Sequence, residues 1–170
     1  TVGKIVELER RIQGMEIRGA SGIAHTRWAT HGEPNERNAH PQIDGAQEVF
    51  VVHNGIIENH LPIKKRLLKE GVAFRSETDT EVLAHLISKF FDGDLAEAVR
   101  RTMQELEGTF GLAVIHRRAP GEVAVARRGS PLVIGVGDEG NFAASDISAM
   151  VRYTNKVVHL NDNEMALLTP

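Results

Sequence analysis

The sequence predicts an α+β fold in which helices and strands form separate layers. Helical patterns follow one another between residues 59 and 108, and short apolar runs separated by glycines follow from residue 109 onward. Grouped helices and grouped strands favour a layered sandwich over a parallel sheet built from alternating βαβ units. The 170 residues suffice for one core, and neither an internal repeat nor a Pro/Ser-rich linker divides them. We therefore treat residues 1–170 as one domain.

Before residue 58, the apolar spacing predicts one helix and two strands. A short amphipathic helix is expected over 2–12, where the apolar residues recur on one helical face. Residues 22–28 and 48–52 are typical of strands, the second being a continuous buried run. Asn54-Gly55 ends that run. This pair is common in hairpin turns, but the residues after it continue toward a helix instead of returning as a strand.

Three helices are predicted next, each with a recognisable end. Asn59 is placed to cap the first helix, which stops near Gly71. Thr78-Asp79-Thr80-Glu81 has the spacing of a capping box at the start of the second. Asp94 begins the third, and Gly108 closes it. Short strands are then expected over 109–116, 122–127, 132–136, 140–144, 156–160 and 164–168.

The composition excludes several classes of function. Twenty Lys+Arg against 23 Asp+Glu give a net charge of −3, so nothing favours nucleic acid or an anionic membrane surface as a partner. No apolar run approaches the roughly 18 residues of a membrane span, and no signal-peptide pattern is present. Phosphate-binding glycine motifs are absent as well, so we expect no cofactor. A cytoplasmic location is the default expectation.

Cysteine and histidine counts are the unusual part of the composition. There is no cysteine, which excludes disulfides, thiolate metal sites and a thiol nucleophile from these 170 residues. Five of the eight histidines fall between His25 and His60. Their spacing matches no zinc motif, so we predict no metal site. A histidine-based metal hydrolase is kept as an alternative that metal analysis of the purified chain would decide.

Three polar stretches are candidates for chemistry. Residues 25–41 combine histidines, an arginine and the single Trp around Gly/Pro turns, as ligand-binding loops often do. The side-chain amide of Asn54 and the peptide N–H of Gly55 are donors suited to a developing oxyanion. A carboxylate within 76–81 could hold a ligand's ammonium group. Each stretch also has a purely structural explanation: core packing, a hairpin turn and helix capping, respectively.

Read together, these stretches identify a family. Residues 22–32, 38–41, 53–59 and 76–82 closely resemble the glutaminase domains (type 2 glutamine amidotransferases) of the glucosamine-6-phosphate synthase family, the glutamine:fructose-6-phosphate aminotransferases. Similarity at 128–135 and 144–146 extends it over essentially the whole chain. The resemblance implies an N-terminal-nucleophile hydrolase fold, a four-layer αββα sandwich. It also implies that glutamine is hydrolysed through a cysteinyl thioester, with the ammonia passing to a sugar phosphate in a separate isomerase domain.

The resemblance further implies roles for individual residues. Arg27 would bind the α-carboxylate of glutamine through its guanidinium fork, and Asp79 would pair with the α-ammonium. Asn54 and Gly55 would be the oxyanion-hole donors. Trp28 would be a gate toward an ammonia channel, and Thr30 and His31 would contact the substrate from a loop. His40 and His53 would have supporting roles.

One departure from the family pattern concerns the nucleophile. The family uses an amino-terminal Cys whose own α-amino group is the base. This chain begins with Thr1, in a context that matches the family downstream of that Cys, so Thr1 is not a substitute. We therefore expect a domain that is incomplete at its N-terminus, lacking its first strand, and inactive as a glutaminase. An unpaired sheet edge or exposed apolar patch would then favour self-association into a homo-oligomer.

Two alternatives stay open at this point. The chain could be a noncatalytic module that binds glutamine without cleaving it. It could also be the glutaminase domain of an amidophosphoribosyltransferase or an asparagine synthetase, which share the fold and the Asn-Gly donor pair. The stretch at 25–32 favours the aminosugar enzyme over both of these.

Overall fold

The computed structural model describes residues 3–27 and 33–170, which form an α+β fold with antiparallel sheets, as predicted. In chain order the elements are α1 (Ile5–Ile12), β1 (Gln42–Ile43), β2 (Val49–Ile57), α2 (His60–Lys69), α3 (Glu81–Phe90), α4 (Leu95–Glu105), β3 (Gly108–His116), β4 (Val123–Arg128), β5 (Val133–Gly137), β6 (Gly140–Ala144), the 3-10 helix η1 (Ile147–Ala149), β7 (Lys156–His159) and β8 (Glu164–Leu168).

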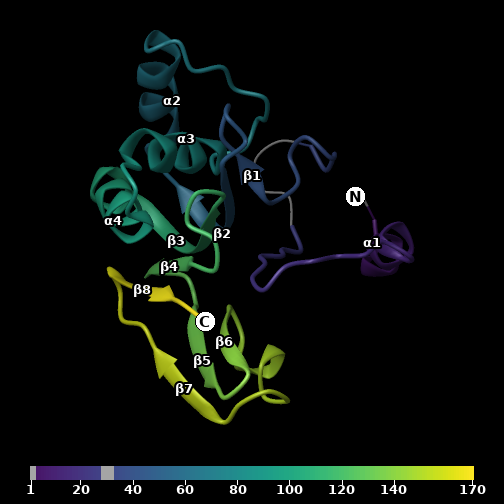
Figure 1. The fold of residues 1–170 in the computed structure, drawn as a ribbon. Helices are drawn as coiled ribbons and strands as arrows, with labels where there is room; N and C mark the ends of the chain where they lie inside the picture. The colour runs from purple at the N-terminus through teal and green to yellow at the C-terminus, as the bar shows by residue number, and fades with distance from the viewer. Residues whose placement is uncertain (1–2, 28–32) are drawn as a thin grey trace.

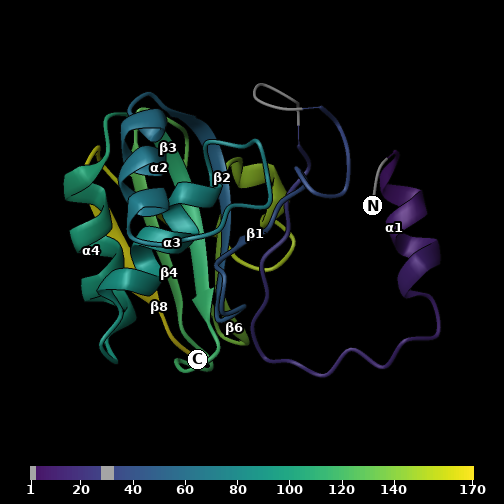
Figure 2. The ribbon, with the colours of Figure 1, turned by 90° about the horizontal axis from the view of Figure 1, so that it is seen from above.

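The larger sheet is five-stranded, in the order β1-β2-β3-β4-β8, and its central pair is β2 with β3. Helices α2, α3 and α4 lie over one of its faces (Figure 2). Side chains alternate between the two faces of a strand. Phe110, Leu112 and Val114 of β3 accordingly belong to the main core beneath the helices, whereas Ala113 packs in a second core on the opposite face.

The smaller sheet, in the order β6-β5-β7, packs on that opposite face. Val125 of β4, Ile134 of β5 and Leu160 are buried between the two sheets. On the outer side, Gly135 leaves room for Met150, whose Sδ lies 2.6 Å from where a Cβ would be. The described residues therefore form a helix layer and two stacked sheets, with η1 and the residues after it on the outermost side.

Helix α1 lies apart from the rest of the molecule in both views (Figures 1 and 2). Its apolar residues recur on one face as predicted, yet no residue of the helix is buried. Ile5 and Leu8, for example, are 61% and 43% exposed. An ion pair of 2.7 Å joins Arg11 to Glu36. An exposed apolar surface of the kind expected to favour self-association is thus present, and self-association itself stays a prediction.

Two strand predictions before residue 58 are corrected by the structure. Residues 22–27 form no strand, because no backbone ladder pairs with them. Strand β2, in contrast, continues through Asn54-Gly55 to Ile57 instead of ending there, since β3 offers a partner along that whole length. Gly55 pairs with Phe110 at a φ of +126°, and a Cβ on Gly55 would lie 2.2 Å from the Thr109 carbonyl oxygen. Only glycine fits there.

The helix ends are partly as predicted. Asp94 caps α4, its carboxylate accepting the Glu97 N–H at 2.9 Å. Asn59 precedes α2 but does not cap it, because its carboxamide bonds to the Glu105 carbonyl and the Glu107 N–H. Gly108 lies in β3 rather than directly after α4.

The predicted capping box before α3 does not form. Thr80 is the residue before the helix, and its side chain makes no capping hydrogen bond. The Glu81 carboxylate instead accepts the N–H groups of Arg75 and Ser76, at 2.7 and 2.6 Å. Burial raises the pKa of Glu81, but the hydrogen bonds from His85 and from these two residues outweigh it, and the pKa falls to about 2.

Within the described ranges, no helix has both the length and the apolar character needed to cross a membrane.

Candidate functional site

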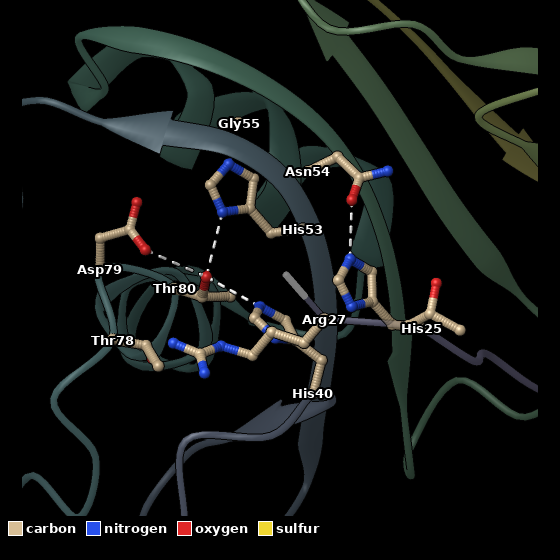
Figure 3. Close-up of a pocket in the computed structure, with 10 residues that line it drawn as sticks. His25, Arg27, His40, His53, Asn54, Gly55, Thr78, Asp79 and Thr80 are labelled. Atoms are coloured by element: carbon tan, nitrogen blue, oxygen red, sulfur yellow. Dashed lines mark hydrogen bonds between the residues drawn. The ribbon is translucent and has the colours of Figure 1, made fainter. Parts of the chain in front are cut away.

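A cavity of about 280 Å³ lies where the start of α3 meets β2 (Figure 3). Pockets for small metabolites begin at about 300 Å³, so the cavity suits a ligand of amino-acid size. Its lining comes from four segments: His25, Thr26 and Arg27 before the undescribed residues, His40 before β1, His53, Asn54 and Gly55 in β2, and Thr78, Asp79 and Thr80 before α3.

Strand alternation explains how neighbouring residues of β2 face different surroundings. Val51 and Ile57 point into the helix-side core, so His53, which shares their parity, points toward α3. Asn54 points to the other side, where its Oδ1 lies 2.7 Å from His25 Nε2. With Oδ1 engaged by His25, the amide nitrogen is the end of the Asn54 side chain available as a donor.

Asp79 is held by β2 rather than by its own helix. Its Oδ2 accepts the Ile57 N–H at 2.8 Å, and the residue is 5% exposed. A carboxylate buried to this degree is stable only where hydrogen bonds or an opposite charge compensate for lost hydration. The backbone of β2 supplies one such bond, and an arginine, Arg27, lines the same cavity.

Thr80 joins two histidines at the centre of the lining. Its Oγ1 lies 3.0 Å from His40 Nε2 and 3.0 Å from His53 Nδ1 (Figure 3). His53 Nε2 reaches the carbonyl oxygen of Thr109 at 3.3 Å. The ring of His25 lies beside that of His40, with centroids 4.5 Å apart.

Burial keeps two of these imidazoles uncharged. It lowers the pKa of His40 to about 3, and repulsion from His25, His53 and Arg27 adds to the effect. Burial also lowers the pKa of His53, against the opposing attraction of Asp79. At neutral pH neither His40 nor His53 brings a positive charge. Arg27 and Asp79 therefore set the charge balance of the cavity, which suits a ligand carrying one negative and one positive group.

The structure thus brings six of the residues predicted for the site to one cavity: Arg27, His40, His53, Asn54, Gly55 and Asp79. Their individual roles stay predictions. Trp28, Thr30 and His31 lie outside the described residues. Thr80 was expected only as part of a helix cap, and its contacts with His40 and His53 have no signal in the neighbouring sequence. Among residues 3–27 and 33–170 no group of three His, Asp or Glu could hold a metal ion.

Comparison with known proteins gives a consistent answer. Residues 25–152 match the family model described as "Glutamine amidotransferase domain". A curated relative from Aquifex aeolicus, named glutamine–fructose-6-phosphate aminotransferase [isomerizing], is 54% identical over 99% of this chain. A relative of the same name from Thermococcus kodakarensis is 49% identical over 98% of the chain. In both cases this chain spans 28% of the relative's length.

Solved structures share the fold. A glutamine phosphoribosylpyrophosphate amidotransferase from B. subtilis, complexed with ADP and GMP, aligns with a TM-score of 0.71 at 26% identity. A second structure, described as the allosteric regulatory enzyme of purine biosynthesis, aligns with a TM-score of 0.72 at 27% identity. Both alignments cover 85% of this chain and 32% of the other. The predicted N-terminal-nucleophile hydrolase type of sandwich is confirmed by these neighbours.

Proposed function

Because the chain belongs to the glutamine amidotransferase domain family, we propose that the cavity at the start of α3 binds glutamine. The observation that carries the proposal is the pairing of charges: Arg27 and Asp79 line the same cavity, and the histidines on Thr80 add no charge to it. A free amino acid is a zwitterion, so one fixed cation and one fixed anion recognise its two head groups together.

Each residue has a defined task in this proposal. The Arg27 guanidinium binds the α-carboxylate with two parallel hydrogen bonds, and the Asp79 carboxylate binds the α-ammonium. The side-chain amide of the ligand then lies toward Asn54 and Gly55. Their N–H groups would stabilise the oxyanion that forms when the amide carbon is attacked, each contributing roughly 3 kcal/mol in the transition state. Trp28, Thr30 and His31 complete the proposed site as the gate and the substrate-loop contacts.

We propose the parent reaction from the names of the relatives. Ammonia released from glutamine would be transferred to fructose 6-phosphate, which is bound by an isomerase domain beyond these 170 residues. Identities of 45–54% to aminotransferases of that name, against 26–27% to the purine enzymes, favour this acceptor. Both substrates are charged, water-soluble metabolites, and we accordingly propose a cytoplasmic setting.

The family resemblance implies that glutamine is hydrolysed by a cysteine nucleophile, and the 170 residues contain no cysteine. The polypeptide is therefore expected to bind glutamine without releasing ammonia. The same feature also fits a noncatalytic glutamine-binding module. The coding sequence upstream of Thr1 separates the two, since an in-frame Cys-Gly start supports the enzyme and its absence supports the module.

Calorimetric titration of the 170-residue chain with L-glutamine tests the proposal. Arg27→Met and Asp79→Asn should each weaken binding by about 10- to 100-fold, as expected for the loss of a charge-assisted hydrogen bond of roughly 1.5–3 kcal/mol. Arg18→Met is the matched control, because Arg18 lies on the same segment, is paired with Glu16 and is absent from the cavity lining. Equal affinity of the Arg27 and Arg18 variants would contradict the proposed site.

A further inference from the structure

Thr80 directly precedes α3, but its hydroxyl does not cap that helix. Its backbone is already helical, with φ −71° and ψ −29°. A capping threonine has an extended backbone instead. The hydroxyl lies between two histidine rings, 3.0 Å from each contacting nitrogen, with Asp79 Oδ1 at 3.5 Å (Figure 3). Bonds to two histidines from different segments indicate a role for this hydroxyl beyond local helix stability.

The direction of each hydrogen bond follows from which atoms can donate. The Thr109 carbonyl can only accept, so His53 Nε2, at 3.3 Å from it, carries a proton. His53 is neutral, because burial lowers its pKa. Its Nδ1 is consequently an acceptor, and the Thr80 hydroxyl, at 3.0 Å, donates to it.

That assignment determines the state of the second histidine. A hydroxyl has one proton. Thr80 Oγ1 also contacts Asp79 Oδ1 at 3.5 Å, but the contact with His53 Nδ1 at 3.0 Å is the shorter of the two, so the proton is directed at His53. His40 Nε2 must therefore carry a proton and donate it to Thr80 Oγ1. With its pKa lowered to about 3 by burial, His40 is neutral and its Nδ1 is an acceptor. This Nδ1 is buried and has no hydrogen-bond partner among the described residues.

The resulting chain of hydrogen bonds runs in one direction, from His40 through Thr80 and His53 to the backbone of β3. It joins the loop before β1, the start of α3, β2 and β3 (Figure 3). Asp79, next to Thr80 in the sequence, is bonded to the Ile57 N–H of β2. The segment that carries Asp79 is thus bonded to β2 by two successive residues, Asp79 and Thr80.

We propose that Thr80 is a positioning residue: its hydroxyl fixes both His40 and His53 as Nε2–H tautomers and, through this chain, holds Asp79 where the ligand's ammonium group binds. The ligand part of this inference rests on the proposed glutamine site. The tautomer part rests on the contacts of Thr80 and on the contact of His53 with the Thr109 carbonyl, and it can be tested without a ligand.

Long-range ¹H–¹⁵N NMR of the histidine rings in the 170-residue chain tests the tautomers directly. Wild-type protein should show both His40 and His53 with protonated Nε2 and unprotonated Nδ1 at neutral pH. Thr80→Val keeps the side-chain shape but removes the hydroxyl, so His40 should lose its single tautomer and show a mixture. Thr80→Ser restores the hydroxyl and should restore the wild-type pattern.

Glutamine affinity provides the second readout. Thr80→Val should weaken binding by about tenfold, which corresponds to 1.4 kcal/mol, and Thr80→Ser should stay within about twofold of wild type. Thr102→Val is the matched control. Thr102 is equally buried, but its hydroxyl bonds only to the Ala98 carbonyl within α4. This control should change neither the histidine tautomers nor the affinity.

The outcomes separate the two proposals. A protonated Nδ1 on His53 or His40 in wild-type protein overturns the ordering by Thr80, whether or not any variant folds. Ordered tautomers together with unweakened binding by Thr80→Val overturn the positioning role. If wild-type protein does not bind glutamine, the proposed function and the ligand part fail together, and the ring spectra still decide the tautomer part.

Discussion

The two walls of the cavity are supported very differently. Asn54, Gly55 and Asp79 belong to β2 and the start of α3, which are part of the main core. His25 and Arg27 come from residues 3–27, where α1 contains no buried residue. One wall is held by packing and sheet hydrogen bonds, the other by polar contacts such as His25 with Asn54. The proposed oxyanion donors and the proposed ammonium partner thus belong to the core, whereas the proposed carboxylate partner, Arg27, belongs to the segment outside it.

Glycine substitutions give the largest expected contrast between the walls. Gly55→Ala places a Cβ 2.2 Å from the Thr109 carbonyl oxygen at a positive φ, so β2 and β3 must separate locally. We expect a loss of about 4 kcal/mol in the free energy of unfolding, in the range of exceptional single substitutions. Gly22→Ala meets nothing within 4 Å and should change stability by less than about 0.5 kcal/mol. Urea unfolding measures both, and similar losses would contradict the contrast.

Two leucines compare the regions through apolar packing alone. Leu83 of α3 is completely buried, and Leu83→Ala should cost about 3 kcal/mol through lost burial and the cavity left behind. Leu8 of α1 is 43% exposed, and Leu8→Ala should cost less than about 0.5 kcal/mol of global stability. Thermal unfolding of the two variants checks this. A large loss for Leu8→Ala would mean that α1 packs on the body in solution.

Acid titration distinguishes a carboxylate of the body from one outside it. The folded pKa of Glu81 is about 2, below its ordinary value of 4.5, so its stabilisation is complete above pH 4.5 and is lost as the pH falls toward 2. Glu81→Gln should lower the free energy of unfolding by about 2 kcal/mol at neutral pH, because hydrogen bonds to a charged carboxylate are lost. The loss should be smaller in acid, where the wild-type carboxylate becomes protonated. Arg11 also lowers the pKa of Glu36, but the pair is exposed and screened by water, so Glu36→Gln should change the pH dependence much less than Glu81→Gln. Chemical unfolding between pH 2 and 7 measures this, and a flat wild-type profile would refute the role of Glu81.

The sequence was informative where an element depends on its own residues. The alternation in β3 and β4 and the Asp94 cap of α4 are local patterns, and the structure has them close to the predicted positions. The strand expected over 22–28 has the right composition, but a strand also needs a neighbour, and none pairs with 22–27. Asn54-Gly55 has a turn composition, yet pairing with β3 keeps it extended.

The candidate site shows the same difference between residues that the sequence could indicate and a contact that depends on distant partners. Residue types indicated Asn54 and Gly55 as oxyanion donors, whereas Arg27 and Asp79 were selected through the family resemblance. All four line one cavity. The hydroxyl of Thr80 could not be placed from its neighbours in sequence. Its partners, His40 and His53, are 40 and 27 residues away and reach it only through the packing of α3 on the sheet.

The loop before β1 is closed against the start of α3 by the carboxamide of Asn38, which is fully buried. Its Oδ1 accepts the Glu77 N–H at 3.0 Å, while its Nδ2 donates to the Glu77 carboxylate at 3.1 Å and to the Glu33 carbonyl at 3.0 Å. Deamidation would replace that NH₂ with a carboxylate oxygen and set a second anion directly against the Glu77 carboxylate. Chemical ageing at this one amide would therefore open the loop that carries His40, and the burial that makes the change so disruptive also shields Asn38 from water.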